Sequence, residues 1–199
     1  MQKPKVIVIL GQTATGKSDL AVKIALRLRS GHSGSEESSG SKKRPSAKNI
    51  GGEIISADSR QVYKNLDIGT GKISQKEMRG APHHLLNVAN PKDKFTVVEY
   101  QKKAISAMAD IVKRNKIPII CGGTGLYIDA ITKGIIFPEA PPNKKLRKKL
   151  YSKSAIALFE YLKKLDPKRA KNIEAKNKVR LVRAIEIAKA LGEVPPLKQ

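Results

Sequence analysis

The stretch Gly11-Gln12-Thr13-Ala14-Thr15-Gly16-Lys17-Ser18 decides the fold class of this 199-residue chain. It follows the apolar run 6–10 and opens into a segment, 18–28, whose apolar residues recur at helical spacing. The spacing GxxxxGK(S/T) is that of a phosphate-binding loop, in which glycines admit an anion and lysine adds charge. A plain glycine-rich turn explains neither Lys17 nor Ser18. The sequence therefore predicts a strand, a phosphate loop and a helix in that order.

Composition and charge limit the classes of protein that fit. Hydrophobic residues make up 40% of the chain, which is enough for one domain of ordinary size with a small appendage. Aromatic residues make up 4% and tryptophan is absent, which weighs against a module that binds RNA by stacking bases. The 40 Lys and Arg against 17 Asp and Glu give +23, which favours a polyanionic partner such as nucleic acid. A basic, soluble surface without such a partner is the alternative.

The expected location follows from cysteine content and the N-terminal sequence. Cys121 is the single cysteine, so no intramolecular disulfide can form and a reducing compartment is expected. The first apolar run is too short for a signal peptide or a membrane span. We expect a cytoplasmic protein with no membrane partner.

Two further strand ends carry polar residues. Ile54-Ile55 predicts a short buried strand that runs into Asp58-Ser59-Arg60-Gln61. A second strand, 117–121, runs into Gly122-Gly123-Thr124-Gly125. In open α/β sheets the ligand crevice lies outside the carboxyl ends of the strands, so both turns are predicted to border the phosphate site. The alternative for Asp58 or Ser59 is a helix cap.

The remaining chain divides by composition. Residues 30–49 are rich in Gly, Ser, Lys and Arg and predict a flexible insertion. Residues 65–90 are loop-rich, and their His83-His84 pair lacks partners at metal-ligand spacing, so packing or phosphate contact is favoured over metal binding. Residues 96–115 predict a helix that covers the sheet.

The fold class predicted is α/β: a P-loop NTPase-like parallel sheet flanked by helices, with a small basic helical insertion lobe. The core is expected over 1–138 and the lobe over 139–177, with a last helix in 178–199 that returns to the core. Residues 139–199 hold 17 Lys and Arg against 6 Asp and Glu, a net of +11. This charge indicates either a solvated basic face or a nucleic-acid surface.

Several motifs in one order resemble the bacterial tRNA dimethylallyltransferases. The resemblance covers nearly the whole chain apart from 30–49. It rests on Gly11-Gln12-Thr13-Ala14-Thr15-Gly16-Lys17-Ser18, on Ile54-Ile55-Ser56-Ala57-Asp58-Ser59-Arg60-Gln61-Val62-Tyr63, on Pro82-His83-His84-Leu85, on Gly122-Gly123-Thr124-Gly125-Leu126-Tyr127-Ile128 and on Arg180-Leu181-Val182-Arg183-Ala184-Ile185-Glu186-Ile187.

The resemblance implies transfer of the dimethylallyl group from dimethylallyl diphosphate to the exocyclic amine of the adenosine 3′ of the tRNA anticodon. The phosphate loop alone favours a nucleoside triphosphate, and the resemblance changes that ligand to a prenyl diphosphate. It also implies two partners, the tRNA anticodon stem-loop and dimethylallyl diphosphate, and a monomeric enzyme.

The resemblance also assigns roles to residues. Asp58 is implied as the general base or as the acceptor that orients the attacking amine, and Thr13 and Arg183 are implied as further catalytic residues. Ser18 is implied as the ligand of Mg²⁺. The diphosphate contacts implied are Gly11, Gln12, Thr13, Ala14, Thr15, Gly16, Lys17, Ser18 and Arg180. The tRNA contacts implied are Asp58, Ser59, Arg60, Gln61 and Thr124.

The sequence departs from the family pattern in three ways. Gln12 stands where the family usually has proline, and Lys176 and Val179 replace polar residues before the last helix. Family members also continue beyond the length of this sequence. Two alternatives therefore stay open: a kinase or isopentenyltransferase that acts on free nucleotides, and a non-catalytic tRNA-binding form.

Overall fold

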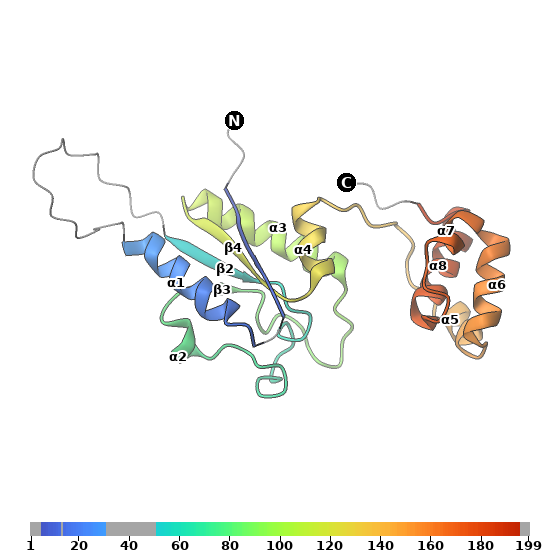
Figure 1. Ribbon diagram of the computed structural model, residues 1–199, viewed down its shortest axis with the longest axis horizontal. Helices are drawn as coiled ribbons and strands as arrows, with labels where there is room; N and C mark the ends of the chain where they lie inside the picture. Colours follow the sequence, from blue (N-terminus) through green and yellow to red (C-terminus); the bar gives the residue numbers. More distant parts are fainter. Residues whose placement is uncertain (1–4, 13, 31–50, 196–199) are drawn as a thin grey trace, which may run out of the picture. The chain divides into compact units, whose positions relative to one another are not determined.

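A four-stranded parallel sheet forms the centre of the first half of the chain (Figure 1). The computed structural model describes residues 5–12, 14–30 and 51–195. Strands lie in the order β1-β4-β2-β3, and every neighbouring pair is parallel, which confirms the predicted sheet type. The strands are β1 (Ile7–Leu10), β2 (Gly52–Ser56), β3 (His83–His84) and β4 (Ile117–Gly122).

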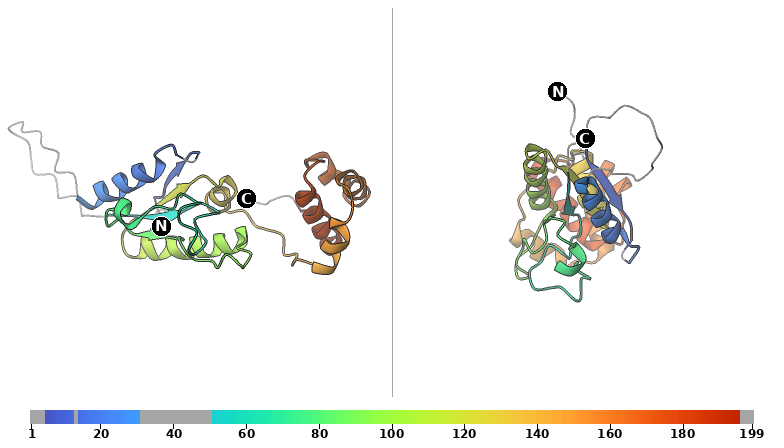
Figure 2. Two further views of the ribbon diagram at one scale, coloured as in Figure 1. Left: turned by 90° about the horizontal axis from the view of Figure 1, so that it is seen from below. Right: turned by 90° about the vertical axis from the view of Figure 1, so that its left-hand side faces the viewer.

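Helices cover both faces of this sheet, as the left view of Figure 2 shows for α1 and α3. Side chains alternate along a strand, so consecutive apolar residues serve opposite faces. Ile54 and Ile119 pack with α1 (Lys17–Ser30). Ile55 and Ile120 belong to the core that contains residues of α3 (Val97–Lys113) and α4 (Gly125–Thr132). This two-sided burial explains why the apolar residues of β2 and β4 are consecutive and do not alternate with polar ones.

Local sequence signals fix the ends of several helices. Thr96 caps α3 in a capping box with Glu99, and Ser74 does the same with Glu77 for the short α2 (Gln75–Met78). Tyr127 of α4 stacks on Tyr100 of α3, with ring centroids 3.8 Å apart. This stack joins the two helices on one face of the sheet.

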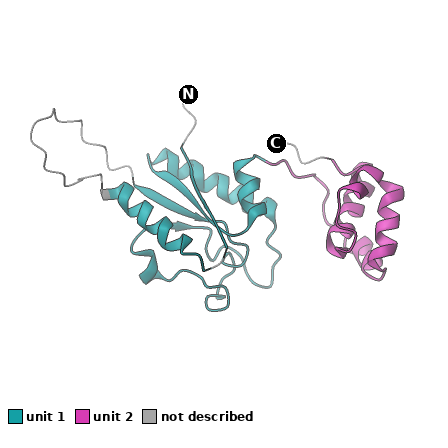
Figure 3. Cartoon of the chain, viewed as in Figure 1, with its two compact units in different colours: residues 1–134 teal, residues 135–199 magenta. Residues whose placement is uncertain are grey.

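The chain divides into two compact units, Met1–Gly134 and Ile135–Gln199 (Figure 3). Unit 2 contains α5 (Lys144–Tyr151), α6 (Ala155–Leu165), α7 (Pro167–Lys171) and α8 (Lys178–Leu191). Its apolar core includes Leu150, Leu158, Leu162, Leu181, Val182 and Ile185.

This division differs from the sequence-based one in two respects. The boundary falls after residue 134 instead of 138, and α8 packs on α5 and α6 within unit 2. The apolar face of α8 was expected on the α/β core, but its leucine and isoleucine side chains meet those of α5 and α6. The predicted insertion over 30–49 lies outside the described residues except for Ser30, which ends α1. Among the described residues, no helix is both long and apolar enough to cross a membrane.

Candidate active site at the carboxyl edge of the sheet

The phosphate loop connects β1 to α1 and folds around the carbonyl of Gln12. Thr15 Oγ1 donates to this carbonyl at 2.8 Å and Lys17 Nζ donates to it at 2.6 Å. Gly16 has a φ of +76°, a left-handed conformation that glycine adopts without strain. The Leu20 amide then donates to the Gly16 carbonyl at 3.0 Å and starts α1. Thr13, expected near the reacting centre, lies outside the described residues.

The carboxyl ends of three strands meet beside this loop. In the sheet register Leu10 pairs with Gly122, and Ser56 pairs with Cys121. A β-carbon at Gly123 would lie 3.1 Å from the Gly11 carbonyl oxygen, so the two turns pass close to each other. The turns after β1, β2 and β4 therefore border one region, as the sequence predicted.

Asp58, Ser59 and Thr124 come together at this edge. The Ser59 amide donates to Thr124 Oγ1 at 3.0 Å, and the Thr124 hydroxyl donates to Ser59 Oγ at 3.3 Å. Asp58 Oδ1 accepts from the Arg60 amide at 2.8 Å and from the Gln61 amide at 3.3 Å. These bonds fix the orientation of the Asp58 carboxylate. The side chain of Arg60 is exposed.

A cavity of about 460 Å³ lies against the phosphate loop. One side is the loop and the start of α1, and the other is the segment that leads into α2. The lining residues are Ala14, Gly16, Lys17, Ser18, Asp19, Gly71, Lys72, Ile73, Glu77 and Arg79. Its size suits a small ligand, and Lys17 and Ser18 stand where the motif predicts phosphate and metal contacts.

The acidic groups at this cavity are already paired. Asp19 contacts Lys23 at 2.7 Å and Arg79 at 3.0 Å, and the Lys23 hydrogen bond together with the Arg79 charge lowers the pKa of Asp19. No group of three or more His, Cys, Asp or Glu gathers as a metal site anywhere in residues 5–12, 14–30 and 51–195. A metal here would depend on the Ser18 hydroxyl and on oxygens of a ligand.

Gln61 has an internal role in addition to the tRNA contact expected for it. Its side-chain Nε2 donates to the Gly71 carbonyl at 3.1 Å, while its backbone amide binds Asp58. Gln61 therefore connects the Asp58 turn to the far wall of the cavity.

The two arginines expected at the diphosphate lie on α8 in unit 2. Arg183 Nη1 donates to Glu186 Oε2 at 2.6 Å, and Arg180 is exposed and lies 3.8 Å from Glu174. Arg147 also binds Glu186, at 2.7 Å. Burial alone would raise the pKa of Glu186, but these donors outweigh it and hold the pKa at about 2.

Lys72, at the cavity wall, is a residue that sequence reasoning missed. Its side chain is 4% exposed, and its ammonium group binds three acceptors. The acceptors come from segments that are separated in the sequence, so no local pattern marks the residue.

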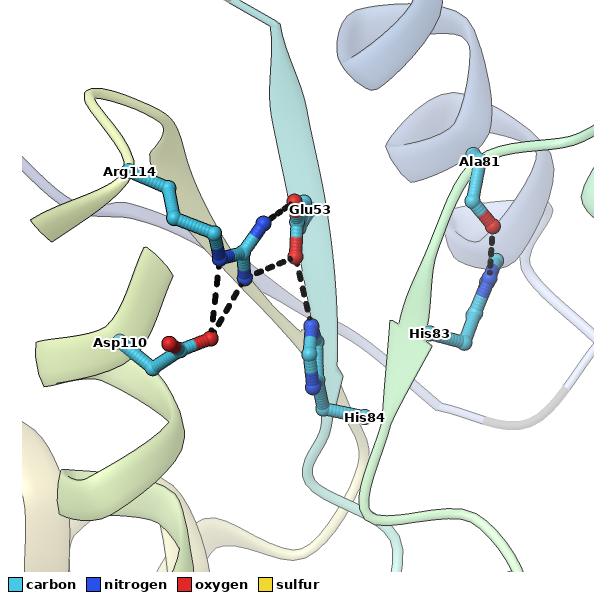
Figure 4. A network of polar contacts seen from close by, with 6 residues as sticks. All are labelled: Glu53, Ala81, His83, His84, Asp110 and Arg114. Carbon is cyan, nitrogen blue, oxygen red and sulfur yellow. Dashed lines mark hydrogen bonds and ion pairs between the residues drawn. The ribbon is translucent and has the colours of Figure 1, made fainter. Parts of the chain in front are cut away.

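A second polar network was also missed, at the amino-terminal part of β2 (Figure 4). Buried Glu53 forms an ion pair with Arg114 at the end of α3 and contacts His84 Nε2 at 2.7 Å. Asp110 holds the other side of Arg114 at 2.7 Å. The Arg114 hydrogen bond, with a smaller contribution from His84, lowers the pKa of Glu53 to about 2. His84 thus pairs with Glu53 across the neighbouring strands β2 and β3.

Comparison with known proteins identifies the family of this chain. Residues 61–199 match the family model described as IPP transferase. A tRNA dimethylallyltransferase of Anoxybacillus flavithermus is 42% identical over 189 residues, which cover 95% of this chain and 54% of the relative. The chain spans about half the length of the curated relatives it matches.

Two solved structures resemble the chain along most of its length. A full-length tRNA isopentenylpyrophosphate transferase from Bacillus halodurans has a TM-score of 0.58 and 35% identity, over 96% of this chain and 57% of that one. A eukaryotic dimethylallyltransferase acting on tRNA has a TM-score of 0.74 and 28% identity, over 97% of this chain and 43% of that one. On these matches and its phosphate-loop sheet, the chain belongs to the IPP transferase family.

Proposed function

We propose that this chain carries the donor site and the catalytic carboxylate of a tRNA dimethylallyltransferase. One observation carries the proposal: the turn after β4 touches the phosphate loop through Gly123 and the Asp58 turn through Thr124, so all three turns border the carboxyl edge of one sheet. The names of the relatives, which act on tRNA or transfer isopentenyl groups, support the choice of substrates. The donor is dimethylallyl diphosphate, and the acceptor is the exocyclic amine of the adenosine 3′ of the anticodon.

The reaction is a substitution at C1 of the dimethylallyl group. The adenosine amine forms the new C–N bond while the bond from C1 to the diphosphate oxygen breaks. Asp58 accepts the proton that the amine loses. The Arg60 and Gln61 amides hold Asp58 Oδ1, so Oδ2 is the oxygen directed to this task.

The phosphate loop receives the diphosphate that leaves. Lys17 binds a loop carbonyl, and a diphosphate in the adjacent cavity would attract its ammonium group more strongly. The Gly16 turn and the first amides of α1 add positive partial charge. We assign Thr13, Arg180 and Arg183 to the same step from the family resemblance. All these groups stabilise the leaving diphosphate as its charge develops.

A magnesium ion fits the chemistry of the residues present. The Ser18 hydroxyl lines the cavity and offers one hard oxygen ligand, and diphosphate oxygens and water supply the others. When bound, Mg²⁺ neutralises charge on the leaving diphosphate.

The tRNA partner is supported by the charge of unit 2. Residues 139–199 carry a net charge of +11, and α5 alone exposes Lys144, Lys145, Lys148 and Lys149. Lys and Arg on this surface bind RNA phosphates, while Ser59, Arg60, Gln61 and Thr124 contact the extruded adenosine. We further propose that the protein is monomeric and cytoplasmic.

A prenylation assay with the 199-residue chain tests the function. Purified protein, Mg²⁺, labelled dimethylallyl diphosphate and unmodified tRNA with adenosine at the target position should give labelled tRNA. AMP and ATP, offered as acceptors in parallel, should remain unlabelled. Lys17→Ala should remove donor binding and serves as the inactive control.

Other results would assign a different function. Labelled AMP or ATP would indicate an isopentenyltransferase of free nucleotides. Salt-sensitive tRNA binding by the folded protein, with no labelled product, would indicate a non-catalytic RNA-binding form. Either result contradicts the proposed activity.

A further inference from the structure

We propose that Lys72 is a positioning residue that holds the far wall of the diphosphate cavity in place. This inference rests on the proposed function, because it concerns the same donor site. The wall is the segment 71–73, which faces Lys17 and Ser18 across the cavity. Lys72 acts through this wall and does not itself take part in the chemistry.

The contacts of Lys72 use its whole hydrogen-bonding capacity. Its Nζ donates to the Tyr63 carbonyl at 2.7 Å, to Asp67 Oδ1 at 2.7 Å and to Asn87 Oδ1 at 2.6 Å. An ammonium group has three donors, and all three have partners here. The side chain is 4% exposed, so an unpaired charge in this place would be costly.

These acceptors come from three parts of the chain. Tyr63 follows the Asp58 turn and bridges to Ala89, Asn87 follows β3, and Asp67 lies in the loop that leads to Lys72 itself. Since β2 and β3 are paired strands of the sheet, two of the three acceptors are fixed by the fold. Lys72 thereby attaches the loop to a rigid support.

Internal hydrogen bonds hold the loop together. The Gly71 amide donates to the Ile68 carbonyl at 3.1 Å, and the Lys72 amide donates to the Asp67 carbonyl at 3.0 Å. Gly71 also accepts the Gln61 side chain, whose backbone amide binds Asp58. A displacement of the loop would therefore change both the cavity and the Asp58 turn.

Space behind the wall gives it room to shift. A second cavity of about 620 Å³ is also lined by Lys72 and Ile73, together with His83, Leu86 and residues of α2. Because Lys72 and Ile73 line both cavities, this segment lies between the two cavities. Removal of the Lys72 ammonium group would let the wall move into the second cavity and widen the donor site.

Binding of inorganic pyrophosphate tests this inference without any need for turnover. Titration calorimetry with Mg²⁺ should show that Lys72→Met raises the Kd at least tenfold relative to the unchanged protein. Lys64→Met, a neighbouring and exposed lysine, should leave the Kd within twofold. Asn87→Gly, which removes one acceptor at a position with φ of +56°, should raise the Kd by a smaller factor.

A variant with lowered stability separates positioning from general destabilisation. Glu53→Gln weakens the network at the other end of β2 and should lower the melting temperature with no change in the pyrophosphate Kd. In the prenylation assay, Lys72→Met should raise KM for the donor, with a smaller change in KM for tRNA.

The outcomes distinguish this inference from the proposed function. If the unchanged protein binds pyrophosphate and both Lys72→Met and Asn87→Gly bind it equally well, the role of Lys72 is wrong and the donor site stands. If Glu53→Gln weakens binding as much as Lys72→Met does, Lys72 is only structural. If the unchanged protein binds no pyrophosphate, both the donor site and the role of Lys72 are overturned.

Discussion

Gly122 and Ala57 lie so close that a β-carbon at position 122 would stand 2.2 Å from the Ala57 carbonyl oxygen. Gly122 ends β4 and Ala57 directly follows β2, and the Ala57 amide donates to the Cys121 carbonyl at 2.8 Å. The Ala57 carbonyl in turn accepts the Thr124 amide at 3.1 Å. The close approach therefore sets where the Asp58 turn and the Thr124 turn meet.

Replacement of Gly122 by alanine should disrupt this close approach. The obstructing atoms belong to the Ala57 backbone and cannot rotate away, so we expect the unfolding free energy to fall by at least about 1–3 kcal/mol. Chemical denaturation measures it. Gly69→Ala is the matched control, because no atom lies within 4 Å of its added carbon, and it should change stability by less than about 0.5 kcal/mol. Equal effects of the two changes would contradict the steric explanation.

Replacement of Asp58 by asparagine should remove the proton acceptor and keep the turn. Asparagine retains an oxygen for the Arg60 and Gln61 amides, so the fold and the pyrophosphate affinity should persist. Turnover should fall by roughly 10²–10⁴, the usual contribution of a general base. Single-turnover prenylation measures the rate of turnover, and titration with pyrophosphate measures the affinity. A parallel drop in pyrophosphate or tRNA affinity would mean that Asp58 is a binding residue.

The Glu53 network should make stability depend on acidic pH. The folded-state pKa of Glu53 is held at about 2 by Arg114 and His84, below the value of an unfolded glutamate near 4.5. The ionised Glu53 carboxylate therefore contributes fully to the free energy of unfolding above about pH 4.5, and this contribution is lost as the pH falls toward 2. The Glu53 side chain is 6% exposed but that of Arg114 is 41% exposed, so solvent screens part of this interaction.

Comparison of Glu53→Gln with the unchanged protein isolates this contribution. Glu186 also has a pKa of about 2, so the protein carries more than one acid-sensitive group. The difference in unfolding free energy between the two proteins should be constant from about pH 7 to 5 and should shrink below about pH 4.5. A difference that stays constant down to about pH 3 would show that Glu53 is not paired as described.

The basic surface of unit 2 should give tRNA binding a steep salt dependence. Lys144 and Lys145 are exposed at the start of α5, beside a cavity of about 610 Å³. Replacing both by glutamine should reduce the slope of log K against log salt by about 0.7–0.9 for each phosphate that is no longer neutralised. Filter binding at several salt concentrations measures it. Lys102→Gln with Lys103→Gln, an exposed pair on α3, is the matched control, and an equal change there would mean that only net charge matters.

Local signals made part of this molecule predictable. The phosphate loop, α1 and α3 follow from motifs and caps that lie within a few residues of one another. β3 was not predicted, because His83-His84 becomes a strand only through pairing with β2. The helix α4 was not predicted either, since its apolar residues follow a glycine-rich turn that reads as a loop. The three bonds of Lys72 need distant acceptors, which no single-sequence pattern encodes.

The helices against which α8 packs could not be predicted from the sequence either. Spacing of apolar residues shows which face of a helix is buried, but several apolar surfaces can serve as its partner. Leu181 and Ile185 meet the leucines of α5 and α6, and the choice follows from the three-dimensional course of the chain.

The position of β1 at one end of the four-stranded sheet affects how the protein behaves in solution. Among the described residues, β1 pairs with β4 alone. The apolar side chains of Val8 and Leu10 on β1 and of Leu20 on α1 are exposed. The unpaired backbone groups of such an edge strand can form hydrogen bonds with a strand of another molecule. The net charge of +23 opposes this association, because the molecules repel one another at low ionic strength. Salt screens that repulsion but does not weaken strand pairing at β1. Concentrated stocks should therefore remain clear at low ionic strength and turn cloudy when salt is added, the reverse of ordinary salting-in.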